Sequence, residues 1–120
     1  IQLDKENYFR YVENEENTEI YAIFYQNKLM KQLYATYGNI MFLDGTYNLN
    51  DVDYPCIVFV IIDNNRKSRI VGFAFVACER EIILHSLLLF FKKNNDTSIT
   101  KCIMIDKDMK EDRVIQVFLI

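Results

Sequence analysis

Two aspartates, Asp44 and Asp106, have the residue type and setting to do chemistry. Each one closes a short apolar run, residues 40–43 in the first case and 102–105 in the second. If these runs form neighbouring strands, the two carboxylates meet at one edge of a sheet. Paired carboxylates are hard oxygen ligands that suit Mg²⁺ or Mn²⁺, and two such ions about 4 Å apart support phosphodiester chemistry. The alternative is that each aspartate is only a turn or helix-capping residue.

The elements that would position these aspartates follow from the hydrophobic pattern. Asn27 is a good helix N-cap and Gly38 a good helix stop, so they bound a helix over residues 28–37. A second helix is predicted over 79–93, with basic Lys92 and Lys93 in its last turn. Strands are predicted over residues 19–25, 39–44, 56–62, 69–77 and 100–105, and a further helix begins within 107–119.

The order of these elements predicts a mixed α/β sheet. The strands over 56–62 and 69–77 are joined by a short polar turn and form an antiparallel hairpin. The helix over 79–93 then crosses back to the strand over 100–105. We therefore expect the strands that end at Asp44 and Asp106 to lie side by side and parallel.

Length and composition indicate one ordinary globular domain. The chain has 120 residues, of which 51% are hydrophobic and 26% charged, so it can bury a core. Residues 1–18 are polar and acidic and are predicted to be a solvated lead-in, which leaves 19–120 as the domain. The formal net charge of −3 gives no overall attraction to DNA, and no stretch approaches the ~20 apolar residues of a membrane span.

The cysteines predict neither a disulfide framework nor a zinc site. Cys56, Cys78 and Cys102 are odd in number and widely spaced, without a CxxC pair. Their apolar surroundings favour buried free thiols, typical of an intracellular, reducing compartment. The one histidine, His85, falls within the apolar helix and is interpreted as a packing or surface residue.

Short motifs around the two aspartates resemble a known family. The segment LDGTYNLN at 43–50 resembles the LDATYKxN signature of Mutator-like (MULE) transposases, whose domain also occurs in SWIM-zinc-finger proteins. The segments MIDKD at 104–108 and VIQVF at 114–118 resemble the family's TDKD motif and its continuation. The resemblance covers roughly residues 19–119, and the RNase H-like domain of SWIM-zinc-finger proteins is the nearest match.

The resemblance implies an RNase H-like fold of the DDE transposase and integrase type. In the active family, an acidic DD(E/D) triad binds two divalent ions, Mg²⁺ or Mn²⁺, for DNA strand cleavage and transfer. By position, Asp44 is the first acid and Asp106 the second, while the third would lie on a helix beyond residue 120. We therefore expect a C-terminally truncated, transposase-derived domain that is inactive on its own. Gly45 stands where the family usually has alanine.

The resemblance also implies a nuclear location and contact with DNA through a larger parent protein. The SWIM zinc motif CxCx(n)CxH is absent from these residues, so no zinc site is expected here. Basic residues that could position phosphates beside the acidic edge are Arg66, Lys67, Arg69 and Lys107, although a solvated turn and surface lysines are the more usual explanation.

Three hypotheses remain open from the sequence. The chain is a transposase-derived module with ancestral two-metal chemistry, a non-catalytic interaction scaffold of a SWIM-type nuclear protein with unknown protein partners, or an unrelated α/β domain with two accidental strand-end aspartates. The last predicts that Asp44 and Asp106 lie far apart.

Overall fold

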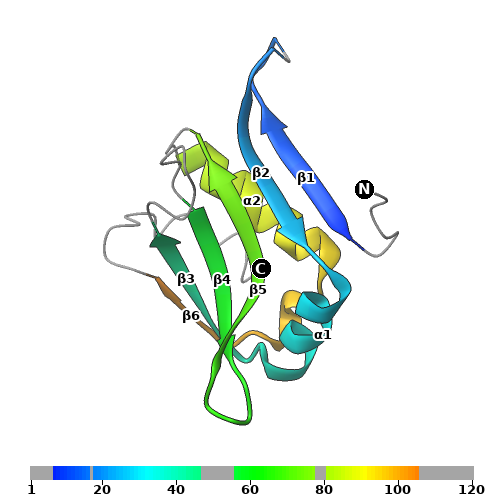
Figure 1. The fold of residues 1–120 in the computed structure, drawn as a ribbon, viewed down its shortest axis with the longest axis vertical. Helices are drawn as coiled ribbons and strands as arrows, with labels where there is room; N and C mark the ends of the chain where they lie inside the picture. The colour runs from blue at the N-terminus through cyan, green and yellow to red at the C-terminus, as the bar shows by residue number, and fades with distance from the viewer. Residues whose placement is uncertain (1–6, 17, 47–55, 78–80, 106–120) are drawn as a thin grey trace.

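A computed structural model describes residues 7–16, 18–46, 56–77 and 81–105 of the chain (Figure 1). It shows a six-stranded sheet in the order β1-β2-β5-β4-β3-β6, with two α-helices and one 3₁₀ helix. In chain order the elements are β1 (Tyr8–Glu13), β2 (Ile20–Gln26), α1 (Lys28–Tyr37), β3 (Ile40–Thr46), β4 (Cys56–Ile62), β5 (Ser68–Val76), α2 (Glu81–Asn94), the 3₁₀ helix η1 (Thr97–Ile99) and β6 (Cys102–Ile105).

The pairing of the strands confirms the predicted hairpin and the predicted parallel pair. Strands β4 and β5 form an antiparallel hairpin, and β3 pairs antiparallel with β4. On its other side β3 pairs with β6, and this pair is parallel. The α2 crossover therefore places the strand that ends at residue 105 beside the strand that contains Asp44. The sheet is mixed, as the element order predicted.

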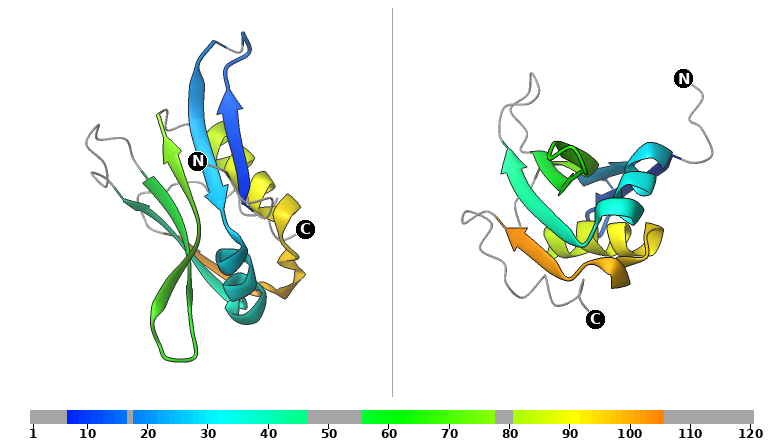
Figure 2. Two further views of the ribbon diagram at one scale, coloured as in Figure 1. Left: turned by 45° about the vertical axis from the view of Figure 1, so that its right-hand side comes forward. Right: turned by 90° about the horizontal axis from the view of Figure 1, so that it is seen from below.

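Both helices pack on one face of the sheet (Figure 2). The Phe91 ring of α2 stacks on Phe59 of β4 at 4.8 Å between centroids and meets Tyr34 of α1 edge-on at 4.7 Å. Phe24 of β2 joins the same cluster through edge-on contacts with Phe59 and Phe91. This aromatic cluster is the centre of the core and joins both helices to the sheet. Within the described ranges, no helix covers the opposite face, which we call the open face.

Helix α1 begins and ends where the sequence predicts, but the glycine at its end has a different role. The Asn27 side chain accepts a hydrogen bond from the Met30 amide at 2.8 Å, as an N-cap does. Gly38 follows the helix with φ −78°, so it does not adopt the left-handed conformation of a typical C′ glycine. A Cβ at this position would lie 2.5 Å from the Tyr34 carbonyl oxygen and 2.7 Å from the Tyr34 ring. Glycine is needed here for close approach.

Three expectations need correction or cannot be compared with the structure. Tyr8–Glu13 form strand β1, so this part of residues 1–18 is not a solvated lead-in; its register with β2 places Val12 opposite the buried Ala22. Cys56 is buried as expected, but Cys102 is exposed because β6 is an edge strand. The helix expected within 107–119, like Cys78, lies outside the described residues. Neither helix in the described part of the chain has the length and apolar character needed to cross a bilayer.

Candidate functional site

Asp44 lies near the end of β3, at the edge that the sequence singled out. It pairs with Val58 of β4 and is half-buried. Its neighbour Leu43 is buried against the helices, so the alternation of a strand directs Asp44 to the open face. The parallel ladder between β3 and β6 ends with Leu43 opposite Ile105. In the sequence Asp44 follows Leu43 and Asp106 follows Ile105, although Asp106 itself lies outside the described residues.

Buried hydrogen bonds fix β6 against the start of β3. The Thr100 hydroxyl donates to the Gly38 carbonyl oxygen at 2.7 Å, so it accepts the short hydrogen bond from the Tyr34 hydroxyl. Burial is the largest effect on Tyr34 and raises the pKa of its phenol, which keeps the hydroxyl protonated as a donor. The Lys101 amide donates to the Asn39 carbonyl at 2.8 Å. These contacts hold the two strands in the register that aligns Leu43 with Ile105.

A second polar cluster anchors the segment between α2 and β6. The Gln26 side chain is fully buried and donates to the Val71 carbonyl at 2.9 Å. It also exchanges two hydrogen bonds with the Asn95 amide, at 3.1 and 2.8 Å, and accepts one from Asn94 at 2.7 Å. Because Asn94 is the last residue of α2 and Asn95 follows it, Gln26 sets where the chain leaves the helix toward β6. The hydrophobic pattern did not single out this residue; an amide that closes an apolar strand was the available signal.

Comparison with known proteins gives one family match. The chain matches the family model described as the RNase H-like domain of zinc finger SWIM domain-containing protein 1/3, over residues 1–119. This chain belongs to that family. A search of curated proteins found no match, and neither did a search of solved structures. The predicted RNase H-like fold and the resemblance to SWIM-zinc-finger proteins are both confirmed.

The basic residues of this RNase H-like domain lie away from Asp44. Strands β3 and β4 are antiparallel, so the turn after β4, which carries Arg66 and Lys67, lies beside the start of β3. Asp44 lies toward the other end. The expectation that Arg66, Lys67 and Arg69 flank the acidic edge is therefore wrong. The turn between β4 and β5 lies at the end of the sheet where β3 begins, whereas Asp44 lies near the end of β3. Lys107 lies outside the described residues.

Other candidate ligands are dispersed. His85 is half-buried on α2, and Cys102 is on the edge strand. In residues 7–16, 18–46, 56–77 and 81–105, no three histidine, cysteine, aspartate or glutamate residues group closely enough to hold a metal ion. Asp44 is therefore the described residue on which a metal hypothesis depends.

Asp63 organises the turn between β4 and β5 of the RNase H-like domain. Its carboxylate accepts hydrogen bonds from the Asn65 and Lys67 amides at 2.8 and 3.0 Å and from Arg69 Nε at 2.9 Å. The bond from Arg69 is the largest cause that holds the pKa of Asp63 below its ordinary value of 3.8, and burial acts in the opposite direction. Arg69 is thus paired, whereas Arg66 and Lys67 extend from the turn.

This pairing predicts a pH dependence of stability. A lowered pKa in the folded state adds stability above the unfolded value of 3.8, and that stability is lost as the pH falls through the lowered pKa. We expect Asp63→Asn to be less stable than the wild type at pH 6, with the difference shrinking as the pH falls below 3.8. Urea denaturation of both proteins between pH 6 and pH 2 measures it. A difference that stays constant over this range would contradict the role of the carboxylate.

Proposed function

We propose that this RNase H-like domain derives from a transposase and retains a divalent-cation position at Asp44 and Asp106. The single observation that supports it is the parallel pairing of β3 and β6, with Leu43 opposite Ile105. If the register continued by one residue, the residues that follow Leu43 and Ile105 would lie side by side at this edge of the sheet. A structural accident would give no reason for an aspartate to follow Leu43 and Ile105 in both segments.

The donor chemistry at this edge fits a hard cation. A carboxylate such as Asp44 is an oxygen ligand that Mg²⁺ and Mn²⁺ prefer. Asp44 and Asp106 would hold the ion, and a bound ion supplies Lewis-acid stabilisation of phosphate oxygens. The half-buried position of Asp44 on a paired strand limits the motion of its carboxylate.

We propose further that the chain alone does not cleave DNA. Two-ion phosphodiester chemistry requires ligands for both ions, and two carboxylates supply too few. The nuclear location and contact with DNA through a parent protein remain parts of this proposal that follow from the family.

The test separates cation binding from cleavage. Mn²⁺ added to the ¹⁵N-labelled chain should broaden the amide signals at the ends of β3 and β6, because the bound ion is paramagnetic. Asp44→Asn should abolish this broadening at low Mn²⁺ concentration. The matched variant Asp96→Asn, at an exposed acid that caps η1, should leave it unchanged.

A plasmid-nicking assay with Mg²⁺ or Mn²⁺ gives the second measurement. We expect no nicking by the wild type. Nicking that disappears in Asp44→Ala would contradict inactivity, and an absence of specific broadening would contradict the cation position.

A non-catalytic interaction scaffold is the second candidate function. It is favoured by the separation of charge along the sheet, where the turn between β1 and β2 carries Glu15, Glu16 and Glu19 and the turn between β4 and β5 carries Arg66 and Lys67. Complementary charged surfaces suit protein recognition and need no metal. Loss of the Mn²⁺ effect without loss of partner binding would favour this candidate.

A further inference from the structure

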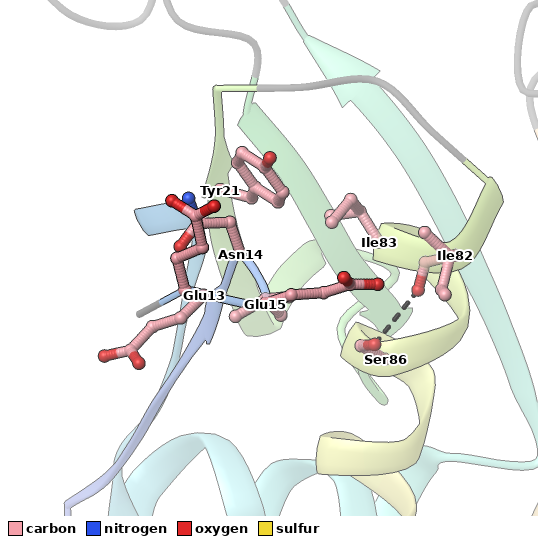
Figure 3. A pocket seen from close by; sticks show the side chains of 9 residues that line it. Glu13, Asn14, Glu15, Tyr21, Ile82, Ile83 and Ser86 are labelled. Atoms are coloured by element: carbon pink, nitrogen blue, oxygen red, sulfur yellow. Dashed lines mark hydrogen bonds between the residues drawn. The ribbon is translucent and has the colours of Figure 1, made fainter. Parts of the chain in front are cut away.

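A groove opens between the β1–β2 hairpin and the start of α2 (Figure 3). Its volume is about 590 Å³, within the range of roughly 300–1,000 Å³ that is typical of ligand pockets. We call it the acidic groove, and the residues that line it are Val12, Glu13, Asn14, Glu15, Glu16, Tyr21, Ile82, Ile83 and Ser86.

The acidic groove combines negative charge with apolar surface. Its glutamates, Glu13, Glu15 and Glu16, are all exposed and come from the hairpin side. On the α2 side, Ile83 is buried whereas Ile82 is 67% exposed, more than any other large hydrophobic residue of the described ranges. An isoleucine this exposed beside carboxylates fits a ligand that carries both cations and apolar groups.

The arrangement of the glutamates disfavours a metal ion as this ligand. In the described part of the chain they do not converge into a group of three that could share one ion. No lysine or arginine is among the described residues that line the groove. Separated carboxylates match cations that are themselves separated, as on a peptide or protein surface.

The chain itself presents such a surface at the turn between β4 and β5. We call residues 62–70 the basic hairpin, which extends beyond the rest of the sheet (Figure 1). Arg66 and Lys67 are exposed at its tip, and Ile62 and Ile70 are exposed at its base. The hydrogen bonds of Asp63 hold the turn in one shape, with Arg66 at φ 62° in the left-handed region. Little backbone entropy is therefore lost when the tip docks.

The acidic groove and the basic hairpin lie at opposite ends of the sheet. Strand β2 begins beside the end of β5, because Ala22 pairs with Val76, whereas the basic hairpin precedes the start of β5. One copy cannot bring its own two surfaces together. We propose that the basic hairpin of one copy docks into the acidic groove of a second copy. This deepens the scaffold function and does not depend on the cation position of Asp44.

The chemistry of the two surfaces sets the properties of the association. Arg66 and Lys67 meet the glutamates, and the exposed isoleucines of the hairpin lie near Ile82. Exposed ion pairs are individually weak, and the Debye length is only about 8 Å at physiological ionic strength. The association is therefore weak and sensitive to salt. Because the two surfaces differ, copies joined in this way form a closed pair or ring, or an open filament.

Sedimentation velocity of the chain at increasing concentration tests the proposal. We expect self-association in 50 mM NaCl that weakens at least about tenfold in 500 mM NaCl. Two charge-reversal variants, Glu15→Lys/Glu16→Lys and Arg66→Glu/Lys67→Glu, should each be monomeric under the low-salt conditions. An equimolar mixture of the two should associate again, because each variant then meets its complement.

Matched controls exclude a general effect of net charge. Lys31→Glu/Lys93→Glu makes the same change in charge as Arg66→Glu/Lys67→Glu, but at exposed helix positions, and should associate like the wild type. Ile82→Ser removes apolar surface without changing charge and should weaken association several-fold. Circular dichroism confirms that each variant is folded.

The outcomes decide between this proposal and its alternatives. A wild type that stays monomeric at all concentrations in low salt would overturn it, as would a mixture that fails to associate or variants that associate like the wild type. Because the readout is self-association, a failure here leaves the Mn²⁺ result on Asp44 unaffected, and the reverse also holds.

Discussion

Replacing Phe91 with alanine is expected to lower the free energy of unfolding by about 3–5 kcal/mol, the cost of removing a large side chain from a packed core. The Phe91 ring has no exposed surface and contacts Phe59, Tyr34 and Phe24. Its ring contacts Tyr34 of α1 as well as Phe24 and Phe59 of the sheet. Its loss leaves a cavity that three rigid rings cannot collapse to fill.

Urea denaturation followed by circular dichroism measures this effect, with Phe9→Ala as the matched control. Phe9 is 39% exposed on the open face and contacts only the edge of the Tyr25 ring among the described aromatic pairs. We expect its replacement to cost about 1 kcal/mol or less. Equal costs at the two positions would contradict the central place of Phe91. If the domain's stability lies near the lower end of the usual range of about 5–15 kcal/mol, the Phe91 variant is partly unfolded at moderate temperature.

The elements that local pattern determines were predictable from the sequence. Asn27 and Gly38 bounded α1 correctly because capping and close approach act within one helical turn. Strands β4 and β5 were predicted because continuous apolar runs on either side of a polar turn leave few alternatives. Strand β1 was missed because its sequence, YFRYVE, buries little surface by itself and depends on β2 for its partner.

The candidate site was predictable in part, for a related reason. Two apolar runs that each end in aspartate predicted neighbouring parallel strands, and the pairing of β3 with β6 confirms this. The basic residues were assigned to the wrong end because spacing along the chain was read without the direction of the hairpin. The antiparallel pairing of β3 with β4, which the sequence did not predict, places Arg66 and Lys67 at the end away from Asp44. The distance between the two carboxylates stays a prediction.

Gln26 could not be assigned a role from sequence, because its partners are distant along the chain. Val71 and Asn95 are 45 and 69 residues away. A buried side-chain amide is costly unless its donor and acceptor atoms both form hydrogen bonds. In Gln26 the amide nitrogen and the carbonyl oxygen both have partners. The cluster is consequently specific to one arrangement of β2, β5 and the end of α2. A hydrophobic residue at position 26 could fill the same space but could not specify that arrangement.

Gln26→Leu is therefore expected to cost roughly 2–4 kcal/mol, because each buried polar group left without a partner costs about 1–3 kcal/mol. The variant keeps a similar side-chain size but leaves the Val71 carbonyl oxygen without the Gln26 donor and removes the partner of Asn94 and Asn95. The same substitution at the exposed Gln32 of α1 should change stability by about 0.5 kcal/mol or less.

The position of Gln26 also predicts where the damage concentrates. Loosening the end of α2 frees the segment that leads through η1 to β6, so the amides of β6 should exchange with solvent faster, relative to those of β4, than in the wild type. Native-state hydrogen exchange measures this ratio. An unchanged ratio with a lowered global stability would show that Gln26 acts only as a core residue. The Tyr34–Thr100–Gly38 and Lys101–Asn39 hydrogen bonds would then suffice to hold β6 in register beside β3.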